Sequence, residues 1–272
     1  MIDCGQNSKI GILVVSCDAY SDLWNPFFAL IALFWPDCPY PIYLCSNYKT
    51  FDANKVISLP IGDDVSWSGN LRKALSQINE NYVLLFLDDL LLTAPVNTKA
   101  VQEVSEWFIG RSGNCVRMNP SPAPDYRLKG SNVPVGIGQV SAGTIYRAST
   151  VLTLWNKRVL CDLLEEGESA WDFEIYGSVR ADAYGGFYAS KHRHFEIVNS
   201  VIKGKWIPSV VPWLSQMGIV PDANRSIMDW PESVIYKFKT IRSILLGIVP
   251  AKMRRNLKHF LLRGKYSYTR HK

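Results

Sequence analysis

The sequence from Tyr82 to Leu92, YVLLFLDDLLL, decides how the chain folds. Its apolar residues are typical of a buried strand, and two adjacent carboxylates, Asp88 and Asp89, interrupt them. Burying an unpaired carboxylate is costly and two adjacent ones repel, so the pair is expected to bind a cation or a hydrogen-bonding ligand. Mg²⁺ and Mn²⁺ take hard oxygen ligands and often share them with substrate phosphates. The alternative is a strand end whose aspartates merely begin a turn or cap the residues from Leu90 onward.

Two apolar runs before this stretch predict the start of a parallel α/β sheet. Residues 9–17, KIGILVVSC, are rich in β-branched residues and are followed by Asp18, and residues 40–45, YPIYLC, predict a second strand. Residues 23–35 have helical spacing, and two strands joined by one helix form a right-handed βαβ unit. Open α/β sheets bind ligands at the carboxyl ends of their strands, which makes Asp18 a candidate binding residue.

A predicted helix over residues 67–75, WSGNLRKAL, leads directly into the central strand. Its leucines face inward, and its first turns expose Asn70, Arg72 and Lys73. These cations either form a solvated face or balance a diphosphate next to the acidic pair.

The second half of the chain predicts further helices and a long loop. Residues 96–109 have amphipathic spacing, residues 115–118 are compatible with a strand, and residues 119–138 are dense in Pro, Gly and Ser. Apolar residues at helical spacing predict a helix over 150–164. Residues 199–207, NSVIKGKWI, predict two strands joined at a glycine turn.

A second group of carboxylates lies in residues 169–180, SAWDFEIYGSVR. Asp172 and Glu174 share a face if the segment is a strand, whereas they fan around the first turn if it begins a helix. Desolvation by Trp171 and Phe173 would raise the pKa of either carboxylate toward that of a general base. The alternative is a helix start at which acidic residues interact favourably with the helix dipole.

Composition indicates a globular protein, because 272 residues with 47% hydrophobic content can bury a sizeable core as one large domain or one domain with an extension. Six cysteines without CxxC or Cys/His metal spacing favour a reducing compartment. The first residues lack the basic segment of a signal peptide, and no apolar run is long enough to cross a bilayer. We therefore expect a cytoplasmic protein.

Residues 234–272 differ from the rest of the chain in charge. They hold eleven Lys or Arg and no Asp or Glu, which leaves 19 basic against 24 acidic residues in the remainder. Apolar residues recur at helical spacing on both sides of Pro250, so two short basic amphipathic helices are predicted, of the kind that lies on an anionic membrane. The alternatives are packing of the apolar stripe on the main domain, with solvated cations, and nucleic-acid binding, for which no accompanying motif is present.

With both acidic sites placed, residues 10–215 resemble nucleotide-sugar glycosyltransferases of the GT-A type, particularly bacterial enzymes of surface-polysaccharide assembly (lipopolysaccharide, O-antigen or capsule). The motifs that carry the resemblance are, in chain order, VVSCD, WSGNL leading into LLFLDDLLL, and WDFEIYGSVR. It implies an α/β, Rossmann-type mixed sheet flanked by helices, with a catalytic domain over 1–233 and a membrane-association segment over 234–272. The chain departs from the family in having Asp-Asp-Leu where Asp-any-Asp is usual, and in lacking the tandem Glu-Asp order of the acceptor motif.

The resemblance implies a role for each candidate residue. Asp88 and Asp89 match the acidic motif that binds metal and diphosphate, so Mn²⁺ or Mg²⁺ is the expected cofactor, with a single metal ligand or metal-free binding left open. Either Glu174 or Asp172 is expected to be the general base. The residues expected to bind the nucleotide sugar are Asp18, which would contact the nucleoside, Asn70, Arg72, Lys73, Asp88 and Arg180.

The expected reaction moves a sugar from a nucleotide-sugar donor to a saccharide or lipid-linked glycan acceptor with inversion, although retention stays open. An alternative is a sugar-1-phosphate nucleotidyltransferase, but such enzymes generally open with a Gly-rich loop and a basic residue, where this chain has DAYSD. Another is a non-catalytic, membrane-associated protein that binds nucleotide sugars or carbohydrate. A lipid-linked acceptor would place the enzyme peripherally on the inner face of the cytoplasmic membrane, and no nucleic-acid partner is expected.

Overall fold

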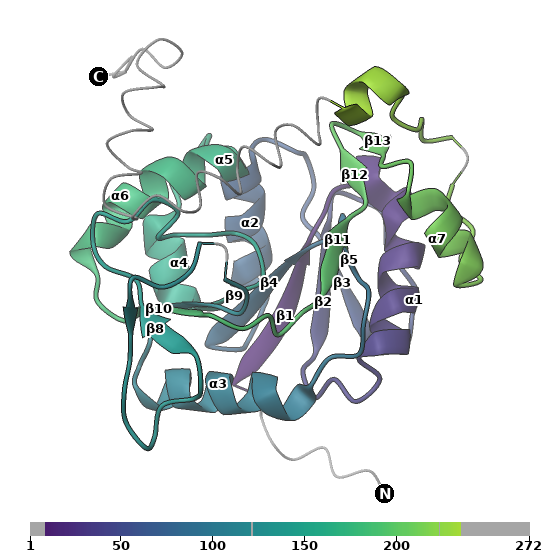
Figure 1. Cartoon of the computed structure of the whole chain (residues 1–272). Coiled ribbons are helices and arrows are strands. Elements are labelled where there is room, and N and C mark those ends of the chain that lie inside the picture. Colours follow the sequence, from purple (N-terminus) through teal and green to yellow (C-terminus); the bar gives the residue numbers. More distant parts are fainter. Residues whose placement is uncertain (1–8, 121, 223, 235–272) are drawn as a thin grey trace, which may run out of the picture.

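A nine-stranded mixed sheet runs through the residues described by the computed structural model, which are 9–120, 122–222 and 224–234 (Figure 1). In order across the sheet, its strands are β3 (Val56–Pro60), β2 (Ile42–Ser46), β1 (Ile10–Val15), β4 (Tyr82–Leu87), β9 (Thr153–Asn156), β6 (Cys115–Arg117), β10 (Phe187–Ser190), β8 (Ile137–Gln139) and β7 (Tyr126–Arg127). β1 to β4 are mutually parallel, and β9 runs antiparallel between β4 and β6. The expected α/β class with a mixed sheet is confirmed.

Helices cover both faces of the sheet (Figure 1). One face packs against α1 (Trp24–Phe34), α3 (Thr98–Gly110) and α7 (Val210–Gln216), and the other against α2 (Trp67–Ser76) and α4 (Lys157–Leu163). Alternate residues of β4 point to the two faces, so that Leu84 and Phe86 belong to the first core and Val83 and Leu85 to the second. Burial on both faces explains why the sequence of β4 is continuously apolar.

The stretch from Tyr82 to Leu92 divides into two strands at the acidic pair. β4 ends at Leu87, and β5 (Leu90–Leu92) leaves the main sheet to pair antiparallel with β11 (Ile197–Asn199). Asp88 and Asp89 therefore occupy the turn between two buried strands. The apolar residues after the pair are buried because they form this second, smaller sheet.

The predicted helix over 150–164 is wrong in its first half. Residues Thr153–Asn156 form β9, and α4 begins at Lys157, where the Asn156 side chain accepts hydrogen bonds from the backbone N–H groups of Arg158 and Val159, at 3.1 and 3.4 Å. Leu154 packs on one face of the sheet and Trp155 on the other. Both are apolar because both faces of the sheet are buried at β9, and the helical spacing there is coincidental.

Other predicted elements are confirmed. They are the helix over 96–109, the strand near 115–118, and the strand pair in 199–207, which is β12 (Val201–Ile202) and β13 (Lys205–Trp206). Among the residues placed by the structure, no helix has the length and apolar character needed to cross a membrane. The predicted membrane-association segment, apart from Val234, lies outside the described residues.

Candidate functional site

The acidic pair lies at the carboxyl edge of the sheet, next to the end of β1. The β1–β4 register pairs Val15 with Leu87, so the residues that follow these two strands are neighbours. Ser16 donates a hydrogen bond from Oγ to Oδ2 of Asp88, and Trp24 Nε1 donates to Ser16 Oγ at 2.7 Å. Asp88 is only 6% exposed. Its side chain is thus held in place by Ser16, directly after β1, which is itself bound by Trp24 of α1.

Both carboxylates have raised pKa values because they are buried. Burial raises the pKa of Asp88 to about 7, although the Ser16 hydrogen bond lowers it, and the charge of Asp89 adds to the increase. Burial also raises the pKa of Asp89 to about 6. Asp89 Oδ1 is buried and has no hydrogen-bond partner among the described residues, whereas its backbone carbonyl accepts from Ser200 N at 2.7 Å and Ser200 Oγ at 3.0 Å. The backbone of the turn is therefore fixed while a carboxylate oxygen is left unsatisfied.

Arg225 brings a positive charge to this edge from the far end of the described chain. Its Nε and Nη2 each donate to Asp22 at 2.6 Å, and its guanidinium lies 4.6 Å from the centre of the Tyr20 ring. The same charge lowers the pKa of Asp88 and so opposes part of the increase caused by burial. Sequence reasoning missed Arg225 because it lies 203 residues from Asp22.

Asp18 lies at the predicted edge, but its carboxylate is already used by the chain. It accepts hydrogen bonds from the backbone N–H groups of Asn47, Tyr48 and Lys49, at 3.0 to 3.2 Å. Asn47 Oδ1 in turn accepts from Asp18 N at 3.0 Å. The structure therefore gives Asp18 the role of fixing the loop after β2.

The three predicted residues of α2 point to different neighbours. Asn70 donates from Nδ2 to Asp64 Oδ1, and its own Oδ1 is buried without a partner among the described residues. Arg72 donates to the carbonyl of Leu164 at 2.5 Å, and Lys73 to that of Ile61 at 3.4 Å. Within the described residues, neither cation forms an ion pair with Asp88 or Asp89.

Glu174 is brought to the same edge of the sheet as the acidic pair. Its Oε1 accepts from Ser149 Oγ at 3.1 Å and from the N and Oγ1 of Thr150 at 2.9 and 3.1 Å. These two residues precede β9, whose first residue, Thr153, pairs with Leu85 of β4. The loop that Glu174 holds therefore begins beside the carboxyl end of β4.

Asp172 and Arg180 are both paired with neighbouring parts of the chain. The short helix α5 (Ala170–Asp172) begins with a capping box. Asp172 Oδ2 accepts a hydrogen bond from Ser169 N at 3.1 Å, and Ser169 Oγ accepts one from Asp172 N. Arg180 forms two hydrogen bonds with Glu168, at 2.6 and 2.8 Å, and donates to the Leu163 carbonyl. Of the two geometries considered for this segment, the helix start is the observed one.

A divalent metal fits the acidic pair only if a substrate completes its coordination. The described residues contain no group of three or more His, Cys, Asp or Glu side chains that could hold a metal ion. Asp88 and Asp89 offer two carboxylates, one of which has an unpartnered buried oxygen. Mg²⁺ is often bound by one or two carboxylates together with substrate phosphates, so the residues present suit that mode.

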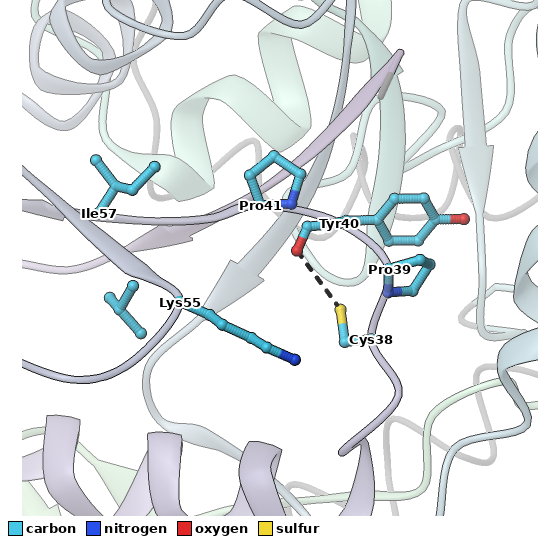
Figure 2. Close-up of a pocket in the computed structure, with 7 residues that line it drawn as sticks. Cys38, Pro39, Tyr40, Pro41, Lys55 and Ile57 are labelled. Carbon is cyan, nitrogen blue, oxygen red and sulfur yellow. Dashed lines mark hydrogen bonds between the residues drawn. The ribbon is translucent and has the colours of Figure 1, made fainter. Parts of the chain in front are cut away.

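A cavity of about 450 Å³ lies at the opposite end of the strands from the acidic pair (Figure 2). It is lined by residues before β2, from Cys38 to Pro41, and by residues 55–57 at the start of β3. These are the amino ends of β2 and β3, whereas the acidic pair follows the carboxyl end of β4. A strand of five residues spans roughly 16 Å, so the cavity and the acidic pair are separate features.

No protein-family model matches the chain, and no curated protein matches it. Among solved structures, the bifunctional IspDF of Campylobacter jejuni is 12% identical over 71% of this chain and 52% of that one, with a TM-score of 0.43. S. aureus TarS 1–349 in complex with UDP is 12% identical over 67% and 60%, with a TM-score of 0.39. A cytidylyltransferase from Leptospira borgpetersenii is 9% identical over 87% and 96%, with a TM-score of 0.48. The chain spans between half and two thirds of the first two structures, and likenesses this distant assign it neither substrate nor reaction.

Proposed function

We propose that the chain is a glycosyltransferase that uses a nucleotide-sugar donor, with the donor's diphosphate bound at the carboxyl ends of β1 and β4. The observation that carries the proposal is the buried acidic pair, whose pKa values are raised and whose Asp89 Oδ1 has no partner among the described residues. An unsatisfied, desolvated acid at a ligand-binding edge is a typical mark of a functional site.

Asp88 and Asp89 are the residues that would hold a divalent cation together with the diphosphate. Such an ion would supply the positive charge that stabilises the departing diphosphate oxygens. Ser16 and Trp24 orient Asp88, and Ser200 orients the turn through the Asp89 carbonyl. These contacts fix the Asp88 carboxylate and the backbone of the turn before the donor binds.

Glu174 is the carboxylate best placed to act as the general base. Its Oε1 is held by Ser149 and Thr150, which leaves Oε2 to receive the proton of the acceptor hydroxyl. The acceptor oxygen then forms a bond to the anomeric carbon as the bond from that carbon to the nucleoside diphosphate breaks. Asp172 is less suited to this role because it completes the capping box of α5.

The acceptor in this proposal is a saccharide or lipid-linked glycan of a cell-surface polysaccharide. Residues 234–272 would attach the enzyme to the inner face of the cytoplasmic membrane through their cationic charge. Full-length protein should sediment with vesicles containing anionic lipid, and less so at high salt, while a variant that ends at Glu232 stays in the supernatant. Equal partitioning of both proteins would contradict the membrane proposal without affecting the catalytic one.

A screen of thermal stability against nucleotides and nucleotide sugars, with and without Mn²⁺, tests the catalytic proposal. A ligand that binds only the native state raises the melting temperature, and the same donor should release nucleoside diphosphate when acceptor is added. Release of pyrophosphate from a nucleoside triphosphate and a sugar 1-phosphate would instead identify a nucleotidyltransferase. Binding of a nucleotide sugar without release of nucleoside diphosphate would identify a non-catalytic protein.

A further inference from the structure

Two separate segments of the chain hold the acidic pair. In the first, Ser16 donates to the Asp88 carboxylate and is itself bound by Trp24, the first residue of α1, at 2.7 Å. In the second, the backbone N–H of Ser200 donates to the Asp89 carbonyl at 2.7 Å. The geometry of the turn that carries both carboxylates therefore depends on where these two segments lie relative to each other.

Arg225 is bound to the first of these segments. Its Nε and Nη2 each donate to the Asp22 carboxylate at 2.6 Å, and Nη2 also donates to the Ala19 carbonyl at 3.1 Å. Asp22 and Ala19 belong to the short 3₁₀ helix η1 (Asp18–Leu23), which leads directly into Trp24. The guanidinium therefore fixes the part of the chain that carries the Trp24 indole.

The same guanidinium is bound to the second segment. Its Nη1 donates to the Gly204 carbonyl at 3.0 Å. Gly204 lies in the turn between β12 and β13, and this hairpin begins directly after Ser200, whose carbonyl accepts from Ile207 N at 2.8 Å. Figure 1 shows the hairpin beside the start of α1. One side chain thus joins the two segments that hold the acidic pair.

The backbone that follows Arg225 is also attached to the hairpin. Trp206 of β13 donates its N–H to the Ser226 carbonyl at 2.9 Å, and Met228 donates its N–H to the Trp206 carbonyl at 2.9 Å. Residues 226–228 therefore lie along β13. The guanidinium reaches η1 from a segment that is hydrogen-bonded to the hairpin on its own account.

These contacts suit a positioning role better than direct binding of a substrate. The side chains of Arg225 and Asp22 are 10% and 14% exposed, and the guanidinium lies 4.6 Å from the centre of the Tyr20 ring. An arginine has five N–H donors, and four hydrogen bonds join this one to described residues. Because Asp22 balances its charge, Arg225 has little capacity left to neutralise a diphosphate.

We propose that Arg225 is a positioning residue for the acidic pair. Through η1 and the β12–β13 hairpin, it holds the turn at Asp88 and Asp89 in the geometry that binds a diphosphate together with its metal ion. The inference rests on the proposed function. Removal of Arg225 leaves both carboxylates and their direct partners, Ser16 and Ser200, in the chain, but the segments that carry these partners are no longer joined by a side chain.

Calorimetric titration of the full chain with UDP, GDP, CDP, ADP and dTDP, each with Mn²⁺ and with a chelator, tests the inference. The nucleotide that the wild-type protein binds is then titrated into Arg225→Ala and Arg225→Lys variants below their melting temperatures. Arg225→Ala should reduce the gain in affinity that Mn²⁺ provides by about 10- to 100-fold, the usual effect of removing a group that orients metal-binding side chains. Arg225→Lys should lose part of the same gain, because an ammonium keeps the charge but not the forked set of donors.

Glu232→Gln is the matched control. Glu232 pairs with Lys205 of β13 at 2.7 Å, so the variant removes another ion pair between the hairpin and the C-terminal part of the described chain without touching η1. Its Mn²⁺-dependent affinity should stay within about twofold of the wild-type value, since a partly exposed pair contributes little. Hydrogen exchange supplies a readout without metal. The Ser200 N–H should exchange several times faster in Arg225→Ala and at an unchanged rate in Glu232→Gln.

The outcomes separate this inference from the proposed function. Failure of the wild-type protein to bind any of the nucleotides would overturn both. Mn²⁺-dependent binding and Ser200 exchange that are the same in the wild-type protein and in both Arg225 variants would overturn the positioning role alone. Wild-type binding that does not depend on Mn²⁺, or an equal loss in Glu232→Gln, would do the same. If Arg225→Ala does not fold, Arg225→Lys, which keeps a charge beside Asp22, carries the test.

Discussion

The two acidic segments of this chain look alike in sequence and differ in how the fold satisfies them. In residues 169–180, Asp172 completes a capping box and Arg180 is paired with Glu168. At the end of β4, burial raises the pKa of both aspartates and Asp89 Oδ1 has no partner within the described residues.

This difference shows how a structural acid can be told from a functional one. A carboxylate that the fold needs is supplied with donors by the fold itself, as Asp172 is. A carboxylate that the fold leaves desolvated and unpaired destabilises the protein, and its retention is most simply explained by a ligand. Glu174 has features of both. The fold supplies donors to its Oε1, which holds a loop at the carboxyl end of the sheet, and Oε2 is the atom that the proposed reaction uses.

Replacing Asp89 by Asn should have the largest effect on turnover. We expect a decrease of about 10²- to 10³-fold, the usual loss when one group that stabilises developing charge is removed. The melting temperature should not fall, because Asp89 Oδ1 makes no hydrogen bond in the described structure. Steady-state release of nucleoside diphosphate and a thermal melt measure the two quantities. The comparison fails if Asp172→Asn loses as much turnover as Asp89→Asn.

Replacing Glu168 by Ala should destabilise the protein without changing the chemistry. Glu168 is the nearer of two carboxylates that pair with Arg180, whose side chain is 22% exposed, so the substitution leaves this largely buried cation with only the exposed Glu165, at 3.4 Å, and the Leu163 carbonyl. We expect a loss of about 1–2 kcal/mol in the free energy of unfolding, below that of a fully buried pair because Glu165 still faces the guanidinium. Urea denaturation measures it, and turnover per folded molecule should stay within about twofold. A large loss of turnover at full stability would mean that Arg180 acts on the substrate.

Replacing Asp88 by Asn should stabilise the protein at neutral and alkaline pH. The pKa of Asp88 in the folded protein is about 7, above its ordinary value of 3.8, so the folded state binds the additional proton between these values. Protonated Asp88 does not reduce the free energy of unfolding at low pH. As pH rises from about 4 to about 7, the contribution of Asp88 makes the free energy of unfolding fall. Asn does not titrate, so the variant should gain about 1–3 kcal/mol at pH 8 and nearly nothing at pH 4. Unfolding in the presence of a chelator measures this, and a gain that does not vary with pH would argue against the raised pKa.

Replacing Ser169 by Ala should have the smallest effect. It removes the N-cap of α5, whose hydroxyl accepts from Asp172 N at 3.2 Å. The expected loss is about 0.5–1 kcal/mol in the free energy of unfolding, with unchanged turnover. Ser131→Ala, at an exposed loop residue, is the matched control and should be neutral. A decrease in turnover for Ser169→Ala alone would indicate that this segment contributes to catalysis.

Local patterns in the sequence were sufficient to predict the first half of the sheet. The runs that form β1, β2 and β4 are each apolar and bounded by polar residues, because parallel strands covered by helices on both faces have this composition. The sequence predicts a helix where β9 lies for a related reason. A short apolar run in the middle of a sheet cannot be distinguished from a buried helix by spacing alone.

The acidic pair was predictable because its charge lies within an apolar run, and no other information is needed to notice that. Its immediate support was harder to predict. Ser16 becomes a neighbour of Asp88 only through the register of β1 and β4, and Ser200 approaches Asp89 only because β11 pairs with β5. The positions of Arg72 and Lys73 depend on the backbone carbonyls of Leu164 and Ile61, which follow α4 and β3, and helical periodicity does not reveal these neighbours.

The contact between Asp22 and Arg225 has a consequence for how the protein is made. Ribosomes add about 5–20 residues per second, so Asp22, which lies 203 residues before its partner, waits about 10–40 s for it. During that time the turn after β1 lacks the guanidinium that also donates to the carbonyls of Ala19 and Gly204. The nascent chain can assemble its parallel strands early, but the end of the sheet that carries Asp88 is completed only after residue 225 has been added.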